Sequence, residues 1–208
     1  MNGFPAPTVA RRGSTDPGAP LVVLLHGRGA DESSIIELAD HLPDGLSYAA
    51  VRAPIAEGGG YAWFANRGIG RPVAASLAET MAWFRGWLDD AGDRPVVLVG
   101  FSGGAAFAGG LLLSAPSRYA GTAVLLGTLP FDAGVPVDPD RLAGSRVLVA
   151  QGEADTVIPR ELLDRTWSYL HGGSGATVTG HRDPGGHAIT PSTLAVLRDW
   201  LEDVAAQR

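Results

Sequence analysis

The side chain best placed to act as a nucleophile is Ser102, in the segment Gly-Phe-Ser-Gly-Gly at residues 100–104. Four apolar residues, 96–99, precede this segment as a buried strand would, and small residues of helical length follow it. The segment fits G-x-S-x-G, in which a serine occupies a sharp strand-to-helix turn with its hydroxyl exposed. We expect Gly100 and Gly104 to be required, since a Cβ at either position would press the strand against the helix. About 0.2 such matches arise by chance in a chain of this composition, so the pattern alone is weak evidence.

A serine nucleophile needs a histidine to accept its proton and a carboxylate to orient that histidine, here in the chain order serine, acid, histidine. Asp155 has the right place, because it lies just past a predicted strand at residues 146–151 and before a helix that begins at Pro159. Glu153 in the same turn is the alternative acid. A helix-capping role is the alternative interpretation of Asp155.

Two histidines are candidates for the base. His181 ends the last predicted strand, whereas His187 lies in the glycine-rich loop beyond it and is followed by the final helix. Because the glycines let that side chain reach back over the sheet edge to Ser102, we favour His187. His26 precedes a glycine turn and is expected to shape the backbone rather than transfer protons.

Acyl transfer also needs hydrogen-bond donors for a negatively charged oxygen, each worth about 3–4 kcal/mol. We expect the backbone N–H of Gly103, directly after the serine, to be one donor. The loop after the predicted strand at residues 21–25 should supply the other, through the N–H of Arg28. The side chain of Arg28 is interpreted equally well as a solvated surface group or as a substrate contact.

Two long connections, residues 54–72 and 128–142, are expected to form the walls of a substrate pocket with the turn after the acid. The candidate lining residues, each of which could equally be plain core, are Trp63, Phe64, Leu129, Phe131, Val157 and Ile158. Lysine is absent, which excludes Schiff-base and P-loop lysine chemistry, and the mechanism requires no metal or organic cofactor.

The remaining periodicity places these groups on an alternating α/β framework. Strands are expected at residues 21–25, 46–53, 96–99, 120–127, 146–151 and 176–181, with an edge strand at 7–12; helices are expected at 33–42, 73–91, 159–171 and 190–206, besides the one after Ser102. Such alternation predicts a doubly wound, mostly parallel sheet flanked by helices, as a single domain over residues 1–208. Functional groups should then collect at the carboxyl ends of the strands.

Composition restricts the partners and the compartment. The 208 residues carry a net charge of −6, and the 16 basic residues are arginines scattered singly apart from Arg11 and Arg12, so we expect no nucleic-acid surface. No run approaches the roughly 18 apolar residues that span a membrane. With no cysteine and no signal-peptide pattern, a soluble cytoplasmic protein is expected. The sequence does not define the oligomeric state, and a homodimer is compatible with it.

Taken together, these motifs resemble the phospholipase/carboxylesterase family of α/β-hydrolases, which includes acyl-protein thioesterases. The resemblance covers nearly the whole chain and rests on residues 25–32, Gly58-Gly59-Gly60 with Trp63-Phe64, residues 100–104, Gly152 with Asp155 and Pro159, and Gly186-His187. It implies a serine hydrolase without a cap domain, with Ser102, Asp155 and His187 as its catalytic triad, acting on small-molecule carboxylic esters or thioesters.

One residue departs from the pattern of the thioesterase members, which usually carry glutamine after the serine where this chain has Gly103. We therefore expect a carboxylesterase for small or medium acyl groups. A thioesterase or lysophospholipase, an acyltransferase using the same triad, and a non-catalytic ligand-binding protein of the same fold stay open as alternatives.

Overall fold

A seven-stranded sheet forms the centre of the molecule in a computed structural model, which describes residues 3–206. Its strands, in spatial order, are β1 (Val9–Gly13), β3 (Ser47–Val51), β2 (Leu21–Leu25), β8 (Val96–Phe101), β9 (Gly121–Leu125), β10 (Arg146–Gly152) and β11 (Thr177–Asp183). Only β1 is antiparallel to its neighbour. The predicted doubly wound, mostly parallel sheet is confirmed, with β1 and β11 as the edges.

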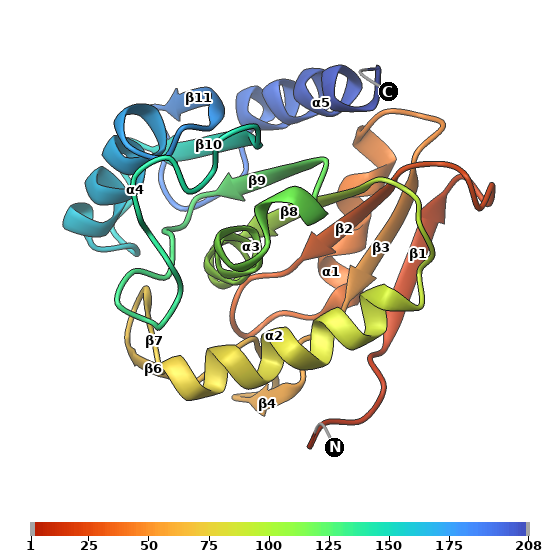
Figure 1. Cartoon of the computed structure of the whole chain (residues 1–208), viewed down its shortest axis with the longest axis horizontal. Helices are drawn as coiled ribbons and strands as arrows, with labels where there is room; N and C mark the ends of the chain where they lie inside the picture. Colours follow the sequence, from red (N-terminus) through yellow and green to blue (C-terminus); the bar gives the residue numbers. More distant parts are fainter. Residues whose placement is uncertain (1–2, 207–208) are drawn as a thin grey trace.

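Helices cover both faces of this sheet (Figure 1). Their bounds are α1 (Glu32–Ile35), α2 (Ala74–Asp89), α3 (Gly103–Ser114), α4 (Arg160–Gly172) and α5 (Pro191–Ala206), with short 3₁₀ helices at Ile36–His41 and Pro116–Arg118. Helices α2, α3 and α4 pack on one face, and α1 and α5 on the other. The helix expected at residues 33–42 is thus one α-helical turn that continues as a 3₁₀ helix.

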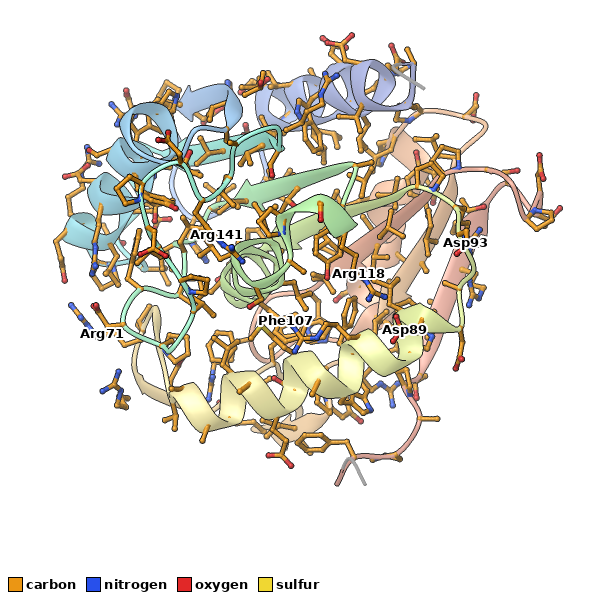
Figure 2. All side chains as sticks on the ribbon, viewed as in Figure 1. Arg71, Asp89, Asp93, Phe107, Arg118 and Arg141 are labelled. Carbon is orange, nitrogen blue, oxygen red and sulfur yellow. The ribbon has the colours of Figure 1, made fainter. Side chains whose placement is uncertain are left out.

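The core explains why the central strands are continuously apolar. Every residue of β2, β3 and β9 is buried, as expected of parallel strands covered on both faces. Phe107 of α3, labelled in Figure 2, lies between α3 and α2, where its ring stacks on Trp63 at 4.4 Å and meets Phe84 edge-on at 5.5 Å. This aromatic group joins the first long connection to the helix behind Ser102.

The connection at residues 54–72 is not a plain loop. It contains two small hairpins, β4 (Ile55–Glu57) with β5 (Gly60–Ala62), and β6 (Asn66–Gly68) with β7 (Arg71–Pro72). The pattern of short glycine-rich segments gave no alternation long enough to predict these strands. Among residues 3–206, no helix combines the length and the apolar character needed to cross a membrane.

Candidate active site

Ser102 occupies the sharp turn between β8 and α3. Its backbone has φ 54° and ψ −113°, in the left-handed half of conformational space, which costs a non-glycine residue about 1–3 kcal/mol. A Cβ on Gly100 would lie 2.2 Å from the carbonyl oxygen of Gly104, and one on Gly104 would lie 2.1 Å from that of Leu25. The expected close approach is therefore present, and only glycine fits at these two positions.

His187 lies between Ser102 and Asp155. Its Nε2 is 2.9 Å from the Ser102 hydroxyl oxygen, and its Nδ1 is 2.8 Å from Oδ2 of Asp155. The Asp155 side chain has no exposed surface and the His187 side chain is 16% exposed. Because a carboxylate only accepts, Nδ1 carries the proton and Nε2 is left to accept from the serine. The structure thus joins the three predicted residues in one hydrogen-bonded series.

Asp155 also caps the turn before α4. Its Oδ1 accepts from the backbone N–H groups of Val157 at 2.8 Å and Ile158 at 3.1 Å, while Oδ2 serves His187. The capping bonds and the contact with His187 are compatible, since each uses a different oxygen. Glu153, the alternative acid, is exposed and makes no hydrogen bond to His187 among the described residues.

The loop that carries His187 is fixed to the turn that carries Asp155. The N–H of Glu153 donates to the carbonyl oxygen of Asp183 at 2.7 Å, and that of Ala154 to Gly185 at 3.0 Å. A Cβ on Gly152 would lie 2.3 Å from the carbonyl oxygen of Gly186. The backbone contacts therefore set the separation of acid and base before the side chains meet.

Asp183 is a residue of this region that the sequence prediction missed. Its carboxylate accepts from the Ser192 hydroxyl, from the Thr190 hydroxyl at 2.6 Å and from the Gly185 N–H at 2.7 Å, and these bonds lower the pKa of Asp183 to about 2. It therefore ties both ends of the His187 loop together. The signal was present as an aspartate followed two residues later by glycine, the pattern of an Asx turn.

His181, the alternative base, faces elsewhere. Its Nε2 lies 3.3 Å from the hydroxyl oxygen of Ser192, and it is not among the residues that line the cleft at Ser102. The structure does not bring it to the serine.

Two backbone donors lie beside Ser102. Gly103 opens α3, so its N–H has no partner within the helix, and neither it nor the N–H of Arg28 is donated to any acceptor in residues 3–206. A Cβ on Gly103 would be only 3.3 Å from the Arg28 nitrogen. The hairpin β4–β5 braces the Arg28 loop, because Gly29 donates to the Tyr61 carbonyl at 2.9 Å. The two N–H groups without acceptors therefore lie close together beside Ser102.

The side chain of Arg28 is engaged within the protein. Its Nε donates to Glu57 at 2.6 Å, a terminal nitrogen also pairs with that carboxylate, and another donates to the Phe64 carbonyl at 2.9 Å. Neither earlier interpretation describes this arrangement fully, since the guanidinium holds the wall of the site together.

A cleft of about 640 Å³ opens onto Ser102 and is mostly apolar. Four of the predicted pocket residues line it: Trp63, Phe64, Val157 and Ile158. Apolar residues that were not predicted complete its walls: Ile35, Leu38, Ile69 and Ile189. At its rim Ile69 is 53% and Val157 44% exposed.

Leu129 and Phe131 are not among the residues that line the cleft, which corrects the prediction. Leu129 is fully buried and packs against α3 at Gly109, where a Cβ would meet it at 2.6 Å. The Phe131 ring lies under the guanidinium of Arg165 at 4.1 Å. Of the connection at residues 128–142, Thr128 lines the cleft, whereas Leu129 packs on α3 and Phe131 contacts Arg165 of α4.

His26 has the backbone role expected of it. It is completely buried, its Nε2 accepts from the N–H of Ala53 at 3.0 Å, and its Nδ1 donates to the Gly27 carbonyl at 2.7 Å. Burial lowers the pKa of His26 below its ordinary value of 6.5. Within residues 3–206, no three or more His, Asp and Glu side chains group in a way that could hold a metal ion.

Comparisons with known proteins agree on the framework. A family model described as phospholipase/carboxylesterase matches residues 9–205. Over 193 residues the chain is 25% identical to MhqD of Bacillus subtilis (strain 168), a hydrolase by name, covering 88% of this chain and 92% of that protein. The Bacillus cereus carboxylesterase structure is similar with a TM-score of 0.84 and 24% identity, over 95% of this chain and 94% of that one.

A second solved structure, the carboxylesterase from Mesorhizobium loti, is similar with a TM-score of 0.78 and 26% identity, over 92% of this chain and 98% of that one. These likenesses confirm the α/β-hydrolase fold. Since the family model spans nearly the whole sequence, the resemblance seen in the motifs is also confirmed, and the chain belongs to the phospholipase/carboxylesterase family of hydrolases.

Proposed function

We propose that this protein is a serine carboxylesterase that cleaves carboxylic esters with small or medium acyl groups through an acyl-enzyme on Ser102. The observation that carries the proposal is the hydrogen-bonded series from the Ser102 hydroxyl through His187 to Asp155, with separations of 2.9 and 2.8 Å. These distances are those at which a histidine can take the proton of a serine hydroxyl.

The reaction begins when Ser102 Oγ attacks the ester carbonyl carbon and its proton passes to Nε2 of His187. Asp155 holds the imidazole in the productive tautomer and stabilises the imidazolium. The N–H groups of Arg28 and Gly103 stabilise the negative oxygen of the tetrahedral intermediate. His187 then gives the proton to the leaving alkoxide, and the ester bond breaks.

Release of the acyl group repeats these steps with water. His187 accepts a proton from a water molecule, the hydroxide attacks the acyl carbonyl, and the proton returns to Ser102 as the carboxylic acid leaves.

The cleft supports uncharged acyl substrates. Its walls are mostly apolar, and the guanidinium of Arg28 is already paired with Glu57, so a substrate carboxylate would have to break that pair. A volume of about 640 Å³ is within the range of small-molecule sites. A small neutral ester is therefore the substrate class that we propose.

The test compares Ser102→Ala with Ser114→Ala, a serine at the other end of α3 whose hydroxyl donates to the Gly110 carbonyl. We expect S102A to lose p-nitrophenyl ester hydrolysis and labelling by a fluorophosphonate probe, while S114A keeps both. Labelling of S102A at the wild-type level would contradict the proposal. A wild type that neither turns over nor labels would instead indicate a ligand-binding protein without catalysis.

The type of leaving group and of acceptor is tested separately. We expect kcat/KM for p-nitrophenyl butyrate to exceed that for butyrylthiocholine. The reason is that Gly103 lacks the glutamine side chain that the thioesterase members usually carry directly after the serine. The reverse ranking would favour a thioesterase. Product analysis in the presence of an alcohol distinguishes hydrolysis, which yields the free acid, from acyl transfer, which yields a new ester.

A further inference from the structure

A second cavity, of about 460 Å³, lies beside the edge strand β1. It is at the amino-terminal end of the parallel strands, opposite to the end that carries Ser102. It is bounded by the end of β1, the start of β3 and the connection between α2 and β8, which passes beside β1 in Figure 1. Its lining residues include Arg11, Arg12, Ser14, Thr15 and Arg94. The proposed esterase reaction uses none of them.

Three arginine residues thus line one cavity, although only two of them are adjacent in the sequence. None of Arg11, Arg12 and Arg94 forms an ion pair with a carboxylate in the described part of the chain, where the ion pairs involve other arginines. Asp93, labelled in Figure 2, lies on the same connection as Arg94, yet it forms no ion pair with it. The cavity therefore concentrates positive charge in a protein with a net charge of −6.

Arg94 is the least compensated of the three. Its Nε is buried and has no hydrogen-bond partner within residues 3–206. Burial and the nearby charge of Arg11 lower the pKa of Arg94. A buried donor without an acceptor costs free energy, and the cost is greater for a charged group. An anion in the cavity would supply that acceptor and reduce the repulsion between Arg94 and Arg11.

We propose that this cavity binds a phosphate group, either as inorganic phosphate or as the phosphate monoester of a small molecule or lipid headgroup. Guanidinium forks match the oxygens of phosphate in a bidentate manner, and a dianion offsets more of the threefold positive charge than a carboxylate does. The hydroxyl and the N–H of Thr15 are further donors at the cavity wall, since neither has an acceptor among the described residues. A polyanion such as nucleic acid would need an extended basic surface, whereas these arginines surround one cavity.

The experiment measures binding of inorganic phosphate by calorimetry at constant ionic strength, adjusted with sodium chloride. We expect Arg94→Met to weaken phosphate binding by about tenfold or more, as for the loss of hydrogen bonds to a charged group. The matched control is Arg146→Met, which removes an arginine at the start of β10 that has no ion pair in the described residues. Arg146 lies at the same amino-terminal end of the parallel strands but on the other side of the sheet from β1. The control variant should bind phosphate within twofold of the wild type.

A second variant, Arg11→Met, tests the same site in case R94M does not fold. Arg11→Met changes an exposed residue of β1 and should also weaken phosphate binding, while its circular dichroism spectrum stays that of the wild type. Unchanged binding by both R94M and R11M, an equal loss in R146M, or an equal heat signal with chloride alone would overturn the proposal.

The source of the phosphate is resolved by two further titrations. Glycerol 3-phosphate represents a soluble monoester, and vesicles of phosphatidylcholine containing phosphatidic acid represent the lipid headgroup. Loss of either interaction in R94M supports the site and identifies the source that can reach it, whereas retention of both in R94M contradicts it. Ser102→Ala should bind phosphate like the wild type. The proposal of a phosphate site can therefore be supported or contradicted independently of the esterase proposal.

Discussion

His26 and His187 both line the cleft at Ser102, yet their hydrogen-bond partners differ in kind. Each nitrogen of His26 is bonded to backbone, to the Ala53 N–H on one side and the Gly27 carbonyl on the other. Each nitrogen of His187 is bonded to a side chain, the Ser102 hydroxyl or the Asp155 carboxylate. Backbone amides do not exchange protons with imidazole in a reaction, whereas a hydroxyl next to an electrophile can.

This difference shows that a position beyond the carboxyl end of a strand is insufficient to identify a general base. The lone pair of His26 Nε2 is occupied by a backbone N–H, and complete burial disfavours its charged form. His187 keeps its lone pair toward the serine and has a carboxylate to stabilise the imidazolium. One histidine therefore holds the chain in place, and the other is available to move a proton.

The strongest test of this contrast is His187→Ala. We expect kcat for a p-nitrophenyl ester to fall by at least about 10⁴-fold, because loss of the base removes most of the activation of the serine. His181→Ala is the matched control, since that side chain contacts Ser192 rather than Ser102, and it should keep kcat within about threefold. A larger loss in H181A than in H187A would transfer the role of base to His181.

His26→Ala should affect stability far more than H187A does. The substitution leaves a cavity in a fully buried site and removes the acceptor of the Ala53 N–H, so we expect the free energy of unfolding to fall by about 2–4 kcal/mol. Urea unfolding measures the change. The exposed His41→Ala should stay within about 0.5 kcal/mol of the wild type. A kcat loss in H26A that matches H187A, in a protein of wild-type stability, would contradict the assignment.

Asp183→Asn tests whether the loop of His187 needs its own support. Asp183 accepts three hydrogen bonds across this loop, and an amide can replace only part of them. We expect kcat to fall about tenfold per active site with KM within twofold, because His187 is less well aligned with Ser102. Active sites are counted by fluorophosphonate titration.

That count distinguishes positioning from simple destabilisation. A variant that only unfolds more easily would show fewer active sites with unchanged kcat per site. Asp199→Asn, on the exposed side of α5, is the control and should change neither quantity.

The parts of this site that could be predicted are those fixed by local geometry and chain order. The turn at Ser102 could be predicted because its flanking glycines are needed where a strand and a helix approach closely. The chain order of Ser102, Asp155 and His187 could be predicted from the order of the strand ends that carry them. The backbone role of His26 could be predicted from its place before a glycine turn.

The parts that could not be predicted depend on how distant segments pack. Leu129 and Phe131 have the composition of pocket residues, but the connection that carries them packs on α3 and α4. Arg94 is 82 residues from Arg12, so no local pattern indicated that they share a cavity, and the sequence predicted only scattered arginines. Ile69 reaches the rim of the cleft through a hairpin too short to leave a periodic signal.

The smallest expected effect concerns the pH dependence of stability. The pKa of His26 is lowered in the folded protein, so below the ordinary value of 6.5 the unfolded chain binds a proton that the folded chain does not. Its contribution to the free energy of unfolding is therefore complete above pH 6.5 and declines as the pH falls, with a slope of at most about 1.4 kcal/mol per pH unit. The stability difference between wild type and H26A, measured by urea unfolding, should accordingly be smaller at pH 5 than at pH 8. A difference that stays constant or grows on acidification would mean that His26 accepts a proton in the folded state, and the distinction between the two histidines would then be one of degree.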